Sequence, residues 1–157
     1  MRRTPAVILT TVVATGMALP LAAPAHAATT LKFARFYADQ PGADTPYTTT
    51  RLNREYIQVK NVTKKTISLS GYRIHDRKNY HVYYFPKTFR LGAGKTVTVH
   101  TGRGTNTAAN LYWGLKSMAW NNNGDTAYLM KGATKITTCT YTPTRTQLKN
   151  KTGYRNC

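Results

Sequence analysis

The segment from residue 71 to residue 84 holds the densest mixture of aromatic and cationic side chains in the chain, GYRIHDRKNYHVYY. Arginine and lysine attract phosphate groups, and tyrosine rings can stack on bases or sugars. The segment is therefore a candidate contact region for an anionic polymer. In the alternative interpretation, Tyr72 or Tyr83 and Ile74 face a core while the cations face water. The candidate contact residues, in this segment and just after it, are Arg73, Arg77, Lys78, Tyr80, Lys87 and Arg90.

The histidines and acids after residue 27 form no recognisable catalytic set. They are His75, His81 and His100, with Asp39, Asp44, Glu55, Asp76 and Asp125. A nucleophilic triad needs Ser, His and Asp in a fixed geometry, which the adjacency of His75 and Asp76 does not provide. Metal-dependent and acid–base hydrolases usually need more carboxylates. We therefore predict no catalytic residue, metal or cofactor. A small extracellular nuclease or other hydrolase, working through His75 or His81 and a nearby arginine, stays open as the alternative.

Two motifs with a chemical appearance are predicted to be turns. Residues 92–96 (GAGKT) resemble a phosphate-binding loop, but Phe89 stands where that loop needs a glycine, and a strand rather than a helix is expected next. Residues 121–125 (NNNGD) resemble a calcium loop in composition, with one carboxylate and no Glu at the far end. Asn and Gly supply the positive φ angles of a hairpin turn.

The N-terminal residues are typical of a cleavable secretory signal peptide. Arg2 and Arg3 precede an apolar stretch over residues 6–21, and small residues lead up to a cleavage site between Ala27 and Ala28. The apolar stretch is too short and too interrupted for a membrane span, which crosses ~30 Å of hydrocarbon. We predict a signal peptide at residues 1–27, a secreted protein, and no transmembrane segment.

The expected mature chain is strongly basic. Without Arg2 and Arg3 the 23 basic residues become 21, which against 5 acidic residues gives a net charge of +16 over residues 28–157. Such a charge favours attraction to polyanions such as extracellular nucleic acid or an anionic cell-wall polymer. A solvated cationic coat without a dedicated ligand is the alternative. A further place for a binding site is the C-terminal tail, with Arg145, Lys149, Lys151 and Arg155.

The two cysteines, Cys139 and Cys157, are predicted to form a disulfide. An even cysteine count in a secreted chain favours a bridge. Free thiols for redox chemistry or metal binding would favour a short Cys-x-x-Cys spacing, which the chain lacks. The bridge would tether the basic tail of residues 142–157 to the preceding domain.

The pattern of apolar residues is that of β-strands. Ile57 and Val59 alternate with polar neighbours, as do Val97 and Val99, and Gly- and Asn-rich turns separate such segments. We predict strands near residues 31–38, 55–61, 66–75, 80–86, 95–100, 110–113, 125–131 and 134–141. Residues 40–51 are predicted to be a loop and the tail irregular. About eight short strands without a convincing helix indicate an all-β sandwich or small barrel.

Several segments in this order resemble lamin tail domains. They are residues 55–61 (EYIQVKN), 67–74 (ISLSGYRI), 84–86 (YFP), 91–102 (LGAGKTVTVHTG), Trp113, 120–122 (WNN), 124–127 (GDTA) and Leu129. The resemblance covers about residues 30–141, and Tyr72 stands where the family often has Trp. It implies an immunoglobulin-like β-sandwich at residues 28–141 in a bacterial secreted single-domain member. It also implies turn and core roles for Asn61, Gly71, Trp120, Asn122, Gly124 and Asp125.

The family that the chain resembles has no catalytic residue set, and its usual charge is nothing like +16. We therefore expect a non-catalytic binding or structural module whose cationic surface binds anionic polymers. A wall-associated structural or inhibitory protein is a further alternative. The sequence leaves the ligand and the oligomeric state open.

Overall fold

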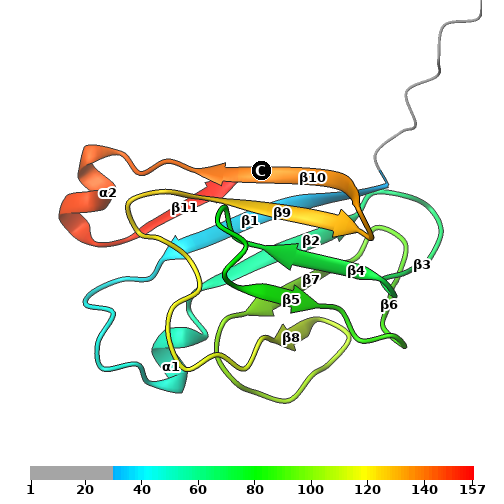
Figure 1. The fold of residues 1–157 in the computed structure, drawn as a ribbon, viewed down its shortest axis with the longest axis horizontal. Helices are drawn as coiled ribbons and strands as arrows, with labels where there is room; N and C mark the ends of the chain where they lie inside the picture. Colours follow the sequence, from blue (N-terminus) through cyan, green and yellow to red (C-terminus); the bar gives the residue numbers. More distant parts are fainter. Residues whose placement is uncertain (1–29) are drawn as a thin grey trace, which may run out of the picture.

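The protein is described by a computed structural model over residues 30–157, in which two β-sheets pack face to face (Figure 1). The predicted signal peptide and its cleavage site at Ala27–Ala28 lie outside the described residues. Within residues 30–157, no helix has the length and apolar character needed to cross a membrane. The predicted immunoglobulin-like β-sandwich is confirmed.

The larger sheet has five strands in the order β11-β1-β2-β7-β8. Their bounds are Gly153–Asn156 (β11), Leu31–Asp39 (β1), Tyr56–Asn61 (β2), Thr96–His100 (β7) and Asn110–Tyr112 (β8). All neighbours are antiparallel except β7 and β8, which are parallel.

The smaller sheet has four strands in the order β10-β9-β4-β5, all antiparallel. Their bounds are Thr134–Tyr141 (β10), Asp125–Lys131 (β9), Tyr72–His75 (β4) and Val82–Tyr84 (β5). A two-stranded ribbon of β3 (Ile67–Ser68) and β6 (Arg90–Leu91) and two short helices, α1 (Thr49–Leu52) and α2 (Arg145–Asn150), complete the described chain.

The core lies between the sheets and follows the two-residue period of the strands. Ile57 and Val59 of β2 are fully buried, as are Ile74 of β4 and Leu129 of β9 on the facing sheet. The loop between β8 and β9 adds Trp120, whose ring meets that of Phe36 edge-on at 4.6 Å between centroids. The alternation that predicted these strands is thus the physical basis of the core.

β1 departs from strict alternation through a bulge. Phe33 and Phe36 are both buried although they are three residues apart, and the register with β2 shifts between them. An extra residue reverses which side chains face inward, so both phenylalanines reach the core and Tyr37 faces outward.

The C-terminal tail is ordered, which corrects the prediction of an irregular segment. Thr144 and Gln147 form a capping box that starts α2, and β11 then pairs with β1 at the edge of the large sheet. The predicted disulfide between Cys139 and Cys157 is present. The tail therefore belongs to the sandwich and supplies one edge strand of the larger, five-stranded sheet.

Two further predictions needed correction. The predicted strand at 66–75 is divided into β3 and β4, because Gly71 adopts a φ of +77° in a turn between them. The predicted loop at 40–51 ends in α1, whose first turn is capped by the Thr48 side chain. Both differences arise from turn and capping interactions, which the two-residue alternation of apolar residues does not predict.

A row of aromatic rings crosses the outer face of the large sheet. It runs through directly paired positions from Tyr154 to Tyr37, Tyr56, His100 and Tyr112, one on each of the five strands. Neighbouring centroids are 5.1–5.9 Å apart. Arg35 covers the Tyr154 end of the row. Such cross-strand pairs contribute roughly 0.2–1 kcal/mol each, so the row stabilises the order of the strands.

Candidate functional site: a cationic hairpin beside sequestered acids

All five acidic side chains of the described chain gather around the Trp120 loop, here residues 119–124. Glu55 accepts the backbone N–H groups of Ala119 and Trp120 at 2.9 and 3.0 Å, and Asp125 accepts that of Asn121 at 3.1 Å. Both oxygens of Asp44 accept from the Asn122 amide at 3.1 Å. Asp39 and Asp76 line hollows on the two sides of this loop.

This arrangement leaves the cations of the surface uncompensated. Four of the five carboxylates are at most 6% exposed, and Asp44 is half-buried. Within residues 30–157 the one carboxylate ion pair joins Asp76 to His81, at 3.1 Å, and none involves a lysine or arginine. The acids therefore act inside the fold, while the positive charge faces solvent.

Burial changes the acid chemistry of two of these carboxyl groups. Complete burial raises the pKa of Glu55 to about 8, although its hydrogen bonds to the Trp120 loop act in the opposite direction. Burial, followed by the charge of Asp44, raises the pKa of Asp39 to about 6. Desolvation disfavours the charged form of a carboxyl group, which explains both directions.

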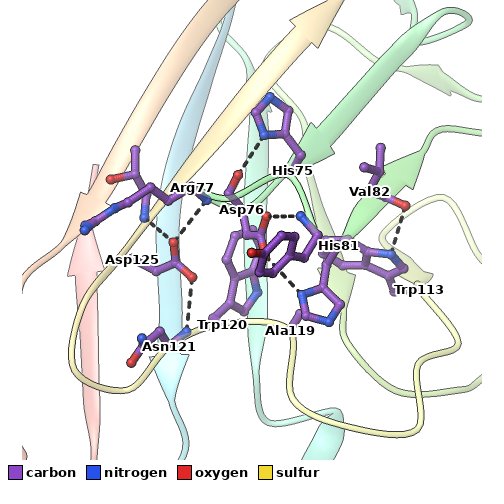
Figure 2. Close-up of polar contacts among 12 residues, drawn as sticks. His75, Asp76, Arg77, His81, Val82, Trp113, Ala119, Trp120, Asn121 and Asp125 are labelled. Atoms are coloured by element: carbon purple, nitrogen blue, oxygen red, sulfur yellow. Dashed lines mark hydrogen bonds and ion pairs between the residues drawn. The ribbon is translucent and has the colours of Figure 1, made fainter.

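The turn between β4 and β5, residues 76–81, is organised by Asp76 (Figure 2). Its carboxylate accepts the Tyr80 backbone N–H at 2.8 Å and lies 3.1 Å from His81 Nδ1. Asn79 adopts a φ of +57°, which asparagine tolerates better than most residues. Asp125 fixes the start of the turn by accepting the Arg77 backbone N–H at 3.2 Å.

The cationic hairpin, meaning Arg77, Lys78 and Tyr80 on this turn, projects from the sandwich. Tyr80 is 76% exposed, and the Lys78 ammonium lies 5.6 Å from the centre of its ring. The two cations and Tyr80 line one side of a hollow of about 290 Å³, whose lining also includes Asp76, Asp125 and Trp120. Arg77 and Lys78 are exposed on the turn and could neutralise a phosphate group there, while a base or sugar meets the tyrosine ring.

The other three predicted contact residues are placed differently. Arg73 lies on β4, where it pairs with Tyr84 of β5, and it donates from Nη1 to the Gly132 carbonyl at 2.5 Å. Lys87 follows β5, beyond the end of the β4–β5 pair that is opposite the turn, and Arg90 lies in β6, which pairs with β3. The structure thus brings together Arg77, Lys78 and Tyr80, with Arg73 along the strand, and separates Lys87 and Arg90 from them.

Sequence reasoning missed three parts of this region. Tyr84 is 69% exposed beside Arg73, and the rings of His75 and Tyr128 stack at 4.9 Å on the outer face of the small sheet. The anchoring role of Asp76 was also missed. An aspartate that begins a turn and bonds to later backbone N–H groups is a recognised signal, whereas the ring stack depends on strand pairing.

The two motifs predicted to be turns are turns. Gly94 has a φ of +66°, and Lys95 N–H donates to the Gly92 carbonyl between β6 and β7. Gly124 has a φ of +120°, and its N–H donates to the Asn121 carbonyl.

The histidines are mostly occupied by structural contacts. Both ring nitrogens of His100 are hydrogen-bonded, to the Asn53 carbonyl at 2.7 Å and to the Asn110 side chain at 3.1 Å. His75 Nδ1 lies 2.7 Å from the Asp76 carbonyl. Among residues 30–157 no three His, Cys, Asp or Glu side chains form a group that could hold a metal ion.

The comparisons with known proteins agree with this architecture. The sequence profile of the Lamin Tail Domain family matches residues 24–143, which is most of the chain. In the comparison with curated proteins, no protein matches this chain. The residues expected from the resemblance to be structural, such as Trp120 and Asp125, lie in the core or bond to turns. The chain therefore belongs to the lamin tail domain family.

Proposed function

We propose that this lamin tail domain is a secreted, non-catalytic module that binds anionic polymers, either extracellular nucleic acid or a cell-wall polymer, through its cationic surface. The observation that carries the proposal is the separation of charge. The five carboxylates are sequestered around the Trp120 loop, and within residues 30–157 no lysine or arginine pairs with one. An uncompensated cationic surface attracts polyanions with little sequence preference.

The cationic hairpin is the contact region that the geometry favours most. Asp76 and Asp125 hold its backbone, so two adjacent cations and an exposed tyrosine are presented on a fixed turn. Less conformational entropy is lost on binding when the contact groups are already positioned.

Changing Arg77 and Lys78 together to alanine should flatten the salt dependence of binding to duplex DNA. Each neutralised phosphate contributes about −0.9 to the slope of log affinity against log salt, so the slope should become shallower by about 2. Fluorescence anisotropy with a labelled duplex, between ~50 and ~200 mM salt, measures this slope.

The matched control changes Lys64 and Lys65 to alanine, an exposed adjacent pair between β2 and β3. Equal flattening by both double changes would identify a distributed cationic coat in place of a hairpin site. Tyr80→Ala removes no charge, so it should leave the slope of log affinity against log salt unchanged. It should weaken single-strand binding by ~1–3 kcal/mol if the ring stacks on a base. An unchanged slope and affinity in the hairpin variant, with its melting temperature preserved, would remove the hairpin from the binding surface.

Protein recovered from the culture medium should begin at or near Ala28. Signal peptidase reads the small residues that precede this position, which is the physical basis of the expected cleavage. Intact-mass measurement of the secreted material checks the expectation, and a soluble extracellular product that retains Met1 would contradict it.

The Asp76–His81 pair keeps one enzymatic alternative open. A carboxylate bonded to one imidazole nitrogen leaves the other nitrogen free to exchange a proton, as in a general base. Purified protein that degrades RNA or DNA, and loses this activity in His81→Ala with the fold intact, would favour a small nuclease over a binding module.

A further inference from the structure

A second hollow, of about 670 Å³, lies on the other side of the Trp120 loop. Its walls are the loop after β1, the Asn121–Asn123 turn and the C-terminal segment, and we call it the tail pocket. Leu148 and Lys151 supply the C-terminal wall, and the Lys151 carbonyl accepts the Gly42 N–H at 3.2 Å. Both lie beyond the residues that match the family profile. The tail pocket is therefore built partly from residues outside the matched family domain.

Two wall residues of the tail pocket carry buried polar groups without a partner. Asp39 is 2% exposed, and its buried Oδ1 has no hydrogen-bond partner within residues 30–157. The indole N–H of Trp120, which is 4% exposed, also lacks a partner. Buried polar groups in folded proteins are nearly always hydrogen-bonded, and an unpaired buried carboxylate is especially costly. Unpaired buried polar groups are expected at functional sites, where a bound ligand supplies the missing hydrogen-bond partners.

The electrostatics of the tail pocket favour a positive ligand group. Asp39 and Asp44 both line it, against the single cationic side chain of Lys151. The charge of Asp44 helps to raise the pKa of Asp39 to about 6, which still leaves Asp39 largely ionised at neutral pH. An ammonium group beside Asp39 would offset both the energetic cost of its burial and its repulsion by Asp44.

The size and lining of the tail pocket favour a hydroxylated ring over a bare ion. A hollow of about 670 Å³ matches small-molecule sites, and no metal-binding group of three acids, histidines or cysteines exists among residues 30–157. The Asn122 NH₂ group already donates to Asp44 and the Asn121 Oδ1 already accepts the Asn123 N–H. The Asn123 amide, the Asn121 NH₂ group and the Asn122 Oδ1 supply the donors and acceptors for hydroxyl groups. Tyr47, 49% exposed in the pocket wall, offers a ring face for stacking.

We propose that the tail pocket binds an amino sugar, with its ammonium group paired to Asp39 and its hydroxyl groups hydrogen-bonded to the asparagine-rich turn. This site is separate from the cationic hairpin and takes a ligand of the opposite charge. Nonspecific attraction to a surface of net charge +16 cannot produce such binding, so the two proposals succeed or fail independently.

The test is isothermal titration calorimetry of the full secreted chain with a glucosamine trisaccharide at neutral pH. One site per molecule is expected. The N-acetylated trisaccharide, which lacks the charge, should bind roughly 10- to 100-fold more weakly, as expected for the loss of a charge-assisted hydrogen bond. Spermidine, a cation without a sugar ring, and Ca²⁺ should not compete. Equal binding of the N-acetylated sugar, competition by spermidine or Ca²⁺, or no binding of the trisaccharide would each overturn the proposal.

Asp39→Asn separates a binding role from a structural one. The change keeps the shape of the side chain and removes an unpaired buried charge, so the melting temperature of the free protein should stay equal or rise. Binding of the glucosamine trisaccharide should fall roughly 10- to 100-fold. Tyr47→Ala should also weaken binding, while its matched control outside the pocket, Tyr84→Ala, should not. Unchanged binding in Asp39→Asn, or a lower melting temperature, would contradict the assignment.

Discussion

Glu55→Ala is expected to lower the free energy of unfolding by roughly 2–6 kcal/mol, because it leaves the Ala119 and Trp120 N–H groups buried without acceptors at ~1–3 kcal/mol each. Glu55 is fully buried and receives both bonds, at 2.9 and 3.0 Å. Through them Glu55, the residue just before β2, holds the Trp120 loop, and with it the ring that packs edge-on against Phe36. Urea unfolding followed by tryptophan fluorescence measures the loss.

Glu55→Gln is the matched variant, because it keeps the size of the side chain and replaces one acceptor oxygen with an NH₂ group. That group cannot accept from a backbone N–H, so a smaller loss of ~1–3 kcal/mol is expected. If the alanine variant is as stable as the wild type, the two hydrogen bonds do not hold the loop.

The same residue predicts a dependence of stability on pH. The folded-state pKa of Glu55 is raised from the ordinary 4.5 to about 8, so the folded protein retains this proton to higher pH than the unfolded chain. Stability from this group is therefore complete below about pH 4.5 and is lost as the pH rises through about 8. Only the wild type loses this contribution as the pH rises. The difference in free energy of unfolding between Glu55→Gln and the wild type should therefore shrink between about pH 5 and about pH 8. A constant deficit over this interval would contradict the raised pKa.

Cys157→Ser is expected to lower the free energy of unfolding by about 3 kcal/mol, since the bridge limits the disorder of the unfolded chain over its closed loop. The two cysteines are 18 positions apart, and the bridge joins β10 to the end of the chain just after β11. Denaturant unfolding with and without a reductant measures the effect. The reductant should weaken the wild type and leave Cys157→Ser unchanged.

A local effect should accompany the global one. Cys157 N–H donates to the Ala34 carbonyl, and β11 pairs with β1 over Arg35 to Asp39. Hydrogen exchange of these β1 amides should therefore increase in Cys157→Ser more than exchange in the centre of β2. Alkylation of both cysteines in the unreduced native protein would show that the bridge is not formed.

The strands themselves were predictable because strand formation leaves a local pattern. The alternation of Ile57 and Val59, or of Val97 and Val99, placed β2 and β7 within a residue of their observed bounds. The tail was harder to predict, because its helix has only six residues and β11 has little apolar pattern. β11 is stabilised by pairing with β1 and by the disulfide, which are contacts with distant residues.

By itself, the sequence determined the all-β sandwich, the excess of positive charge, the cysteine pair and the membership of the lamin tail domain family, because period, composition and motif order are local or additive properties. Only the tertiary structure decided which groups meet. Glu55 binds the backbone of Trp120 across 65 positions, and the aromatic row from Tyr154 to Tyr112 requires five strands in register. The sequestered acids, the hairpin hollow and the tail pocket arise in the same way. Such contacts depend on the register of strand pairing and on the packing of the two sheets. A short stretch of sequence does not by itself determine either one.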